Sequence, residues 1–147
     1  EPVTLDSINE DGIRKILKNE SGKLRLINVW ATWCGPCIIE LPDFVGINRM
    51  YRHRDFELVT ICADKLRKKA TALETLGRLQ VSATNYIFNA DDIYKLIELV
   101  DPKWQGALPY TLLVEPGGKI IYAKQGSIQP IVIKKKIVEY PLIGRYY

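Results

Sequence analysis

One short string, Trp-Cys-Gly-Pro-Cys at residues 33–37, constrains this chain more than any other feature. The apolar run at residues 24–30 that precedes it is short, branched and aromatic enough for a buried strand. Gly35 and Pro36 end that pattern, and a proline is favoured in the first turn of a helix, where its missing N–H costs nothing. The two cysteines are therefore predicted to lie where a buried strand passes into a helix.

That position favours a reactive thiolate at the start of the helix. A helix N-terminus carries partial positive charge and unpaired N–H groups, which stabilise a thiolate over a thiol. The thiolate is the species that attacks a disulfide. Cys34 is predicted to lie at the start of the helix and to attack, and Cys37, one turn further in, is predicted to resolve the mixed disulfide.

A Cys-x-x-Cys pair has two other interpretations. A zinc site needs two more ligands, and the chain offers only Cys62, His53 and carboxylates, without a second Cys-x-x-Cys. An inert structural disulfide stays open as an alternative. The strand, turn and helix pattern around the pair favours the redox interpretation.

The longer string at residues 28–42, from Asn28 to Pro42, resembles the thioredoxin superfamily, and within it the TlpA/ResA-like extracytoplasmic thiol–disulfide oxidoreductases. Asn28 stands where cytosolic thioredoxins resemble one another in having a buried aspartate. Glu40 matches an acidic residue associated in that branch with tuning the active-site thiols, and Pro42 matches a proline that kinks the helix. The resemblance covers roughly residues 24–130.

The resemblance implies an α/β, thioredoxin-like fold, with a central mixed β-sheet flanked by helices. We expect one domain over residues 1–147, with an N-terminal extension at 1–23 and a helical insertion at 64–104 before the strand that follows Pro109. It also implies catalytic roles for Cys34 and Cys37, and roles in thiol tuning or proton relay for Glu40 and Asn28.

The second half of the expected site is Leu108-Pro109, directly before the apolar run at residues 111–114. A proline there is confined to the start of a strand. By resemblance Pro109 is the cis-proline that faces the cysteine pair; an ordinary trans proline is the alternative. A cis bond would expose the backbone of Leu108 to pair with an extended substrate segment. The predicted substrate-binding residues are Trp33, Gly35, Pro36, Leu108 and Pro109.

The function implied is a protein disulfide reductase that needs no cofactor or metal. Its implied partners are disulfides of exported proteins, including apocytochrome c in cytochrome c biogenesis, and an upstream membrane thiol donor. We expect a monomer in an extracytoplasmic compartment such as the bacterial periplasm. One rival is a peroxidase of the same fold, which would need Thr or Ser where Ala31 stands. The other is a copper-binding or adaptor module, for which His53 is a poor ligand.

The length and net charge of the chain exclude further classes of protein. A chain of 147 residues makes one domain with a sizeable core. The net charge of +4 is spread along the chain, whereas a nucleic-acid-binding protein would carry a dense basic stripe. No apolar stretch is long enough to span a bilayer. The chain opens at Glu1 rather than a methionine, and the sequence leaves open whether a leader was removed.

The remaining elements are predicted from periodicity and turn signals. A helix at residues 4–18, capped by Asp6 or Ser7, is expected to pack on the sheet. Residues 56–62 are a second core strand ending in Cys62, which is expected to be buried. His53 is expected to be exposed. The end of the chain, 140–147, is aromatic, and its packing stays undecided.

Residues 64–104 are the hardest part to interpret. Residues 65–79 favour a helix with apolar residues at three-residue steps, and residues 89–100 favour another. Residues 81–88 are consistent with a short strand or an extended segment. The basic side chains of Lys65, Arg67, Lys68 and Lys69 are predicted to form a solvated helix face rather than a site for an acidic partner. Residues 115–119 predict a hairpin turn, and Pro130 begins a last helix to about residue 139.

Overall fold

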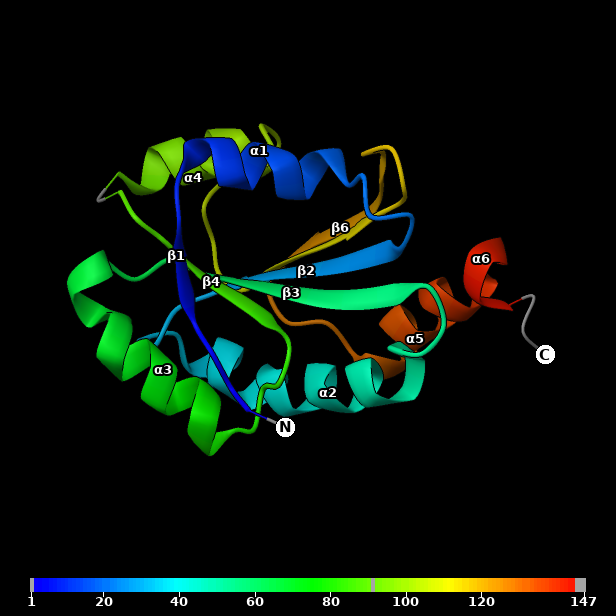
Figure 1. Cartoon of the computed structure of the whole chain (residues 1–147), viewed down its shortest axis with the longest axis horizontal. Coiled ribbons are helices and arrows are strands. Elements are labelled where there is room, and N and C mark those ends of the chain that lie inside the picture. The colour runs from blue at the N-terminus through cyan, green and yellow to red at the C-terminus, as the bar shows by residue number, and fades with distance from the viewer. Residues whose placement is uncertain (1, 91, 145–147) are drawn as a thin grey trace.

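The computed structural model describes residues 2–90 and 92–144. Its centre is a six-stranded mixed sheet in the order β1-β4-β3-β2-β5-β6 (Figure 1). The first four of these strands run parallel and the last two are antiparallel to their neighbours. The strands are β1 (Asp6–Ile8), β2 (Leu24–Trp30), β3 (Phe56–Cys62), β4 (Thr84–Phe88), β5 (Tyr110–Val114) and β6 (Ile120–Gln125).

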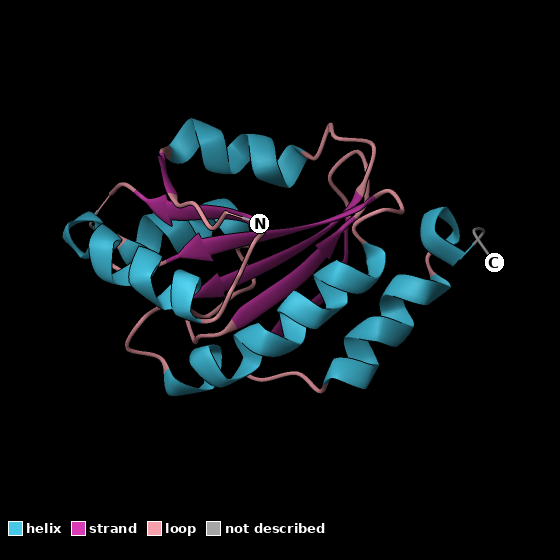
Figure 2. Ribbon diagram, turned by 60° about the horizontal axis from the view of Figure 1, so that its bottom comes forward, coloured by secondary structure: helices cyan, strands magenta, loops and turns pink. Residues whose placement is uncertain are grey.

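Helices cover both faces of the sheet, which gives three layers (Figures 1 and 2). On one face lie α1 (Glu10–Lys18) and α4 (Ile93–Val100). On the other lie α2 (Gly35–Tyr51), α3 (Lys69–Arg78) and α5 (Pro130–Glu139). A short 3-10 helix, η1 (Leu66–Lys68), precedes α3, and α6 (Pro141–Gly144) follows α5.

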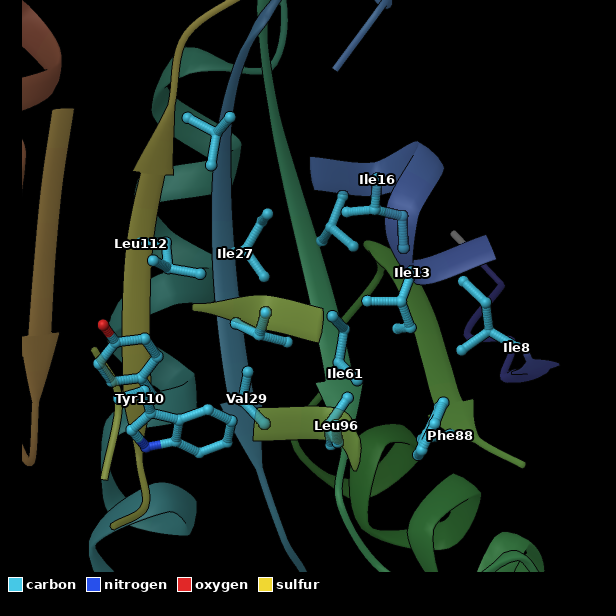
Figure 3. Packing of buried hydrophobic residues seen from close by; sticks show 14 residues of the cluster. Ile8, Ile13, Ile16, Ile27, Val29, Ile61, Phe88, Leu96, Tyr110 and Leu112 are labelled. Atoms are coloured by element: carbon cyan, nitrogen blue, oxygen red, sulfur yellow. The ribbon is translucent and has the colours of Figure 1, made fainter. Parts of the chain in front are cut away.

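Strand β2 is the centre of both apolar layers. Ile27 and Val29 point into the layer under α1 and α4, where Figure 3 shows them beside Ile61 and Leu112. Leu24 and Leu26 belong to the layer under α2 and α5. A strand buried on both faces needs apolar residues without alternation, which is why residues 24–30 are apolar at every position except Arg25 and Asn28.

The N-terminal prediction is wrong at its start. Residues 6–8 form β1, which pairs in parallel with β4, and the helix begins only at Glu10. Asn9 caps α1 by accepting a hydrogen bond from the Gly12 N–H at 2.8 Å, so neither Asp6 nor Ser7 is the cap. Ile8 is buried at the sheet edge, and this tertiary contact overrides the helical periodicity. The expected packing of the helix on the sheet is confirmed by the buried Ile13 and Ile16.

The segment 64–104 is not helical throughout, which corrects the expectation of a helical insertion. Its middle part, β4, is a sheet strand between β1 and β3, in agreement with the strand alternative for residues 81–88. The prediction that apolar residues repeat every three positions is also wrong for α3. Its buried residues are Ala72, Thr75 and Leu76, because a helix repeats every 3.6 residues.

The C-terminal elements agree with the sequence. The turn at 115–119 joins β5 to β6, and α5 spans Pro130–Glu139. Ile143 on α6 is fully buried, so the described part of the last segment docks on the domain; its final residues, 145–147, lie outside the described residues. None of the described helices is long and apolar enough to cross a membrane.

Candidate active site

The cysteine pair sits at the junction of β2 and α2, as the spacing predicts. Cys34 is the N-cap of α2, and its Sγ accepts a hydrogen bond from the Cys37 N–H at 3.3 Å. A disulfide joins Cys34 to Cys37, whose Cα atoms lie 5.3 Å apart. Pro36 lies in the first turn, and Pro42 lies inside the helix. The N–H groups and dipole of α2 are thus directed at the sulfur of Cys34, which favours its thiolate once the disulfide is reduced.

The two sulfurs are not equally covered. Cys34 is 5% exposed and Cys37 is 1% exposed, whereas the neighbouring Trp33 is 72% exposed. Little of the cysteine pair is therefore exposed to solvent, and most of the exposed surface belongs to Cys34. This asymmetry fits Cys34 as the residue that a partner reaches first.

A buried carboxylate behind the turn holds it in place. Asp64, which follows β3, accepts a hydrogen bond from the Thr32 N–H at 2.8 Å through one oxygen and one from the Thr32 hydroxyl through the other. Thr32 stands two residues before Cys34, so this pairing ties the turn to the end of the neighbouring strand. Sequence reasoning missed Asp64; the available signal was an acidic residue two positions after the end of a core strand that runs parallel to β2.

Pro109 lies at the same end of the sheet as the cysteines. Tyr110 at the start of β5 pairs with Val29 near the end of β2. Because the two strands are antiparallel, Pro109, which precedes Tyr110, and Trp30, which follows Val29, lie at the same end of the sheet. The Leu108–Pro109 peptide bond is cis. Leu108 packs against the apolar cluster that contains both cysteines. The Pro109 carbonyl accepts a hydrogen bond from the Gly126 N–H at 2.8 Å, which ties this strand start to the segment after β6.

The loop before Pro109 is fixed by contacts that sequence reasoning did not identify. The rings of Trp104 and Tyr110 stack with centroids 4.8 Å apart. The Tyr110 hydroxyl donates to a carboxylate oxygen of the buried Asp101 at 2.7 Å, and Trp104 Nε1 donates to the Ala107 carbonyl at 2.8 Å. Burial, and then the hydrogen bond to Asp101, raise the pKa of Tyr110 above its ordinary value. The hydroxyl therefore remains a donor, and the loop has a defined shape.

Glu40 is a buried carboxylate on α2 with only one of its oxygens bonded. It is 5% exposed, and its Oε2 accepts a hydrogen bond from the Ile128 N–H at 2.7 Å. Its Oε1 has no hydrogen-bond partner among the described residues. Desolvation by burial raises the pKa of Glu40, an effect that the bond from Ile128 opposes. A carboxyl group in this environment is able to hold a proton that an exposed one would lose.

Asn28 and the third cysteine lie in the interior. Asn28 is 1% exposed in the middle of β2, and its Nδ2 donates to the hydroxyl of Thr111 on β5 at 3.3 Å. Cys62 is fully buried and free, and burial raises the pKa of its thiol, which makes it the small apolar residue that was expected. His53 is exposed. In the described part of the chain no three His, Cys, Asp or Glu side chains come together as a metal site would require.

Comparisons with known proteins agree with this geometry. The family model described as Redoxin matches residues 2–140. The chain is 29% identical over 117 residues to the thiol:disulfide interchange protein HelX of Rhodobacter capsulatus, a match covering 79% of this chain and 60% of HelX. It is 26% identical over 128 residues to the thiol-disulfide oxidoreductase ResA of Bacillus subtilis, covering 84% of this chain and 64% of ResA.

A solved structure supports the fold. The thioredoxin domain of a thiol-disulfide oxidoreductase from Bacteroides vulgatus superposes with a TM-score of 0.68 at 20% identity, covering 84% of this chain and 82% of that domain. At this identity the likeness shows the fold alone, and the expected thioredoxin-like fold is confirmed. The chain spans about 60% of the length of the relatives it matches.

Proposed function

Since the chain belongs to the Redoxin family and is a TlpA/ResA-like member of the thioredoxin superfamily, we propose that it is a thiol–disulfide oxidoreductase that reduces disulfides of partner proteins. One observation carries the proposal. Cys34 caps α2, with its Sγ accepting the Cys37 N–H, and forms a disulfide with Cys37. That is the geometry of a pair that can cycle between a thiolate and a disulfide.

The reaction proceeds in two exchanges. In the reduced protein the Cys34 thiolate attacks one sulfur of the partner's disulfide, the partner's S–S bond breaks, and its other sulfur leaves as a thiolate that takes up a proton. Cys37, after losing its proton, attacks Cys34 Sγ, re-forms the Cys34–Cys37 disulfide and releases the partner's second thiol. The partner's disulfide gains two electrons and the cysteine pair loses two. A second dithiol, from the upstream donor, restores the reduced form.

The surrounding residues have supporting roles in this proposal. Trp33, Gly35, Pro36, Leu108 and Pro109 form the docking surface beside the pair, and the 72% exposure of Trp33 supports a contact with partners. Glu40 is the candidate to accept the proton of Cys37, because its raised pKa and its unbonded oxygen suit it to proton transfer. Asn28, bonded to Thr111, is a candidate to tune the thiols from β2.

The proposed partners and compartment are supported by the relatives. HelX and ResA are named for thiol–disulfide interchange, and the resemblance implies exported substrate proteins, including apocytochrome c. We propose an extracytoplasmic location, a membrane thiol donor, and a monomer that acts as one domain over residues 1–147. The shared sheet, which joins β1 to β6 across almost the whole chain, supports the single domain.

An insulin-reduction assay tests the function. With dithiothreitol as donor, the wild-type chain is expected to accelerate precipitation of the insulin B chain, and Cys34→Ser and Cys37→Ser are expected to abolish the acceleration. Cys62→Ala is the matched control, because the third cysteine is buried and is expected to keep full activity. Retained activity in Cys34→Ser, or peroxide consumption without disulfide reduction, would contradict the proposal.

The reduction potential tests the direction. The reduction potentials of proteins that exchange thiols and disulfides range from about −270 mV for thioredoxin to about −120 mV for a strong oxidant. Equilibration of the Cys34–Cys37 pair with glutathione buffers is expected to give a value at the reducing end. A value above about −150 mV would assign the protein to the oxidants.

A further inference from the structure

A pocket of about 380 Å³ opens directly beside the active-site turn. Trp33 forms one wall, and this side chain is next to Cys34 in the chain. Gly106, three residues before Pro109, forms another part of the lining. Through Trp33 and Gly106 the pocket therefore adjoins both halves of the candidate active site.

The interior of the pocket is apolar. Phe88 at the end of β4 and Leu96 on α4 are 2% and 0% exposed and form its floor; Figure 3 shows the two side chains near each other in the packed layer. Ala63, Ala90 and Ile93 complete the apolar lining. A preformed pocket of this size holds one large side chain, and burying such a side chain is favourable.

The polar groups at the pocket differ in whether they are free to contact a bound partner. Both carboxylate oxygens of Asp64 are occupied by Thr32. On the α4 side, Asp92 accepts the Tyr94 N–H at 3.0 Å and caps that helix. Lys65 is exposed at the rim, and the exposed Arg67 and Lys68 follow it in the chain. No ion pair between described residues involves Lys65, Arg67 or Lys68. These three positive charges outnumber the one carboxylate of the pocket lining, Asp64, so the rim carries a net positive charge.

We propose that this pocket selects the partner: it binds a large apolar side chain beside the partner's redox-active cysteine, with an acidic residue next to that side chain contacting Lys65. The inference rests on the proposed thiol–disulfide exchange and names the substrate class of that same site. The Asp64–Thr32 pairing fixes the turn that carries Trp33, so the wall of the pocket and the attacking sulfur keep a constant relation.

Four cyclic disulfide peptides test the proposal. Beside one cysteine they carry phenylalanine–aspartate, phenylalanine–lysine, serine–aspartate or serine–lysine. The full chain, reduced and freed of reductant, is mixed with each, and the second-order rate of peptide reduction is measured by acid quench and chromatography. The phenylalanine–aspartate peptide is expected to react at least about tenfold faster than the serine–lysine peptide, the ratio that burial of one large apolar side chain supports.

Variants assign the selectivity to the pocket. Ala90→Leu fills it and is expected to bring the phenylalanine-to-serine ratio close to one, whereas Ala70→Leu, on the exposed side of α3, is the matched control and is expected to keep the wild-type ratio. Ala63→Leu repeats the test from the β3 side if Ala90→Leu proves unstable. Lys65→Glu is expected to reverse the preference for aspartate over lysine, and Lys119→Glu, on the distant β5–β6 turn, is expected to keep it.

Each result has one meaning. Equal rates for all four peptides, or a ratio unchanged in both pocket-filling variants, would overturn the pocket proposal while leaving thiol–disulfide exchange intact. Failure to reduce any peptide, and oxidised glutathione as well, would instead overturn the proposed function. If the preference for phenylalanine is observed but Lys65→Glu does not change the preference for aspartate over lysine, the proposed contact between Lys65 and an acidic residue of the partner is wrong.

Discussion

Two buried carboxylates belong to the segments next to the disulfide: Asp64 is bonded to the turn before Cys34, and Glu40 lies on α2 three residues after Cys37. They are bonded differently. On the turn side, both oxygens of Asp64 accept hydrogen bonds from Thr32. On the helix side, Glu40 accepts one hydrogen bond, from Ile128, and its second oxygen has no partner among the described residues. Each of the two residues is 5% exposed, so the difference lies in their bonding and not in their burial.

The difference separates a structural role from a chemical one. A buried carboxylate with both oxygens bonded holds the groups that bond it, and its loss leaves those groups unpaired. A buried carboxylate with an unbonded oxygen pays for desolvation without full compensation, and this raises its pKa. The turn side is therefore expected to respond to mutation mainly in stability, and the helix side mainly in its dependence on pH.

The largest effect is expected from Asp64→Ala. The substitution removes both acceptors and leaves the Thr32 N–H without its partner, which is expected to lower the free energy of unfolding by about 3 kcal/mol. Urea unfolding of the oxidised protein at neutral pH measures this. Glu98→Ala removes an exposed carboxylate from α4 and is the control, with an expected change within about 0.5 kcal/mol. Equal changes in the two variants would show that Asp64 does not hold the turn.

A smaller effect is expected from Thr32→Val, which removes the hydroxyl but keeps the backbone N–H bonded to Asp64. One carboxylate oxygen then loses its donor, and the free energy of unfolding is expected to fall by about 1.5 kcal/mol. Thr32→Ser restores the donor and is expected to recover most of the loss in the same urea titration. A serine variant as unstable as the valine variant would mean that the threonine methyl group, and not the hydroxyl, matters.

The sequence predicted the local half of this site and missed the half that depends on the fold. The strand, the helix start and the Cys34–Cys37 pairing follow from neighbouring residues, since capping and proline preferences act over one turn. The bond from Thr32 to Asp64 joins residues 32 positions apart, and the one from Ile128 to Glu40 joins residues 88 apart. Such partners become visible only once the strand order is known.

The errors have the same cause. Ile8 lies at roughly helical spacing from Ile13 and Ile16, yet β4 offers residues 6–8 an edge to pair with, and that edge comes from a segment about 80 residues away. In the segment 64–104 the helices have clear periodicity, and on that ground the insertion is expected to be helical. Residues 81–88 are compatible with either a short strand or an extended segment, because β4 is short and is placed inside the sheet by its neighbours β1 and β3. Periodicity reports a buried face but not the element that buries it.

The smallest and most specific effect is expected from Glu40→Gln. The raised pKa of Glu40 means that the folded protein binds this proton more tightly than the unfolded chain does, so the contribution to stability is complete below the ordinary pKa of 4.5 and is lost as pH rises through the raised value. Glutamine keeps an acceptor for the Ile128 N–H and carries no charge. The stability of Glu40→Gln relative to wild type is therefore expected to increase as pH rises from about 4.5 to the raised pKa, and to stay constant above it, in urea titrations of the oxidised protein.

The charged groups that act on Glu40 set the control for this experiment. Asp43 on the same helix raises its pKa and Lys124 on β6 lowers it, both less than burial does. Asp43→Asn is therefore expected to leave the shape of the pH dependence nearly unchanged, because it removes a minor cause and leaves Glu40 buried. If the Glu40→Gln and wild-type stabilities stay parallel across the whole pH range, Glu40 binds its proton equally in the folded and unfolded states, and the two sides of the disulfide do not differ in the way their bonding indicates.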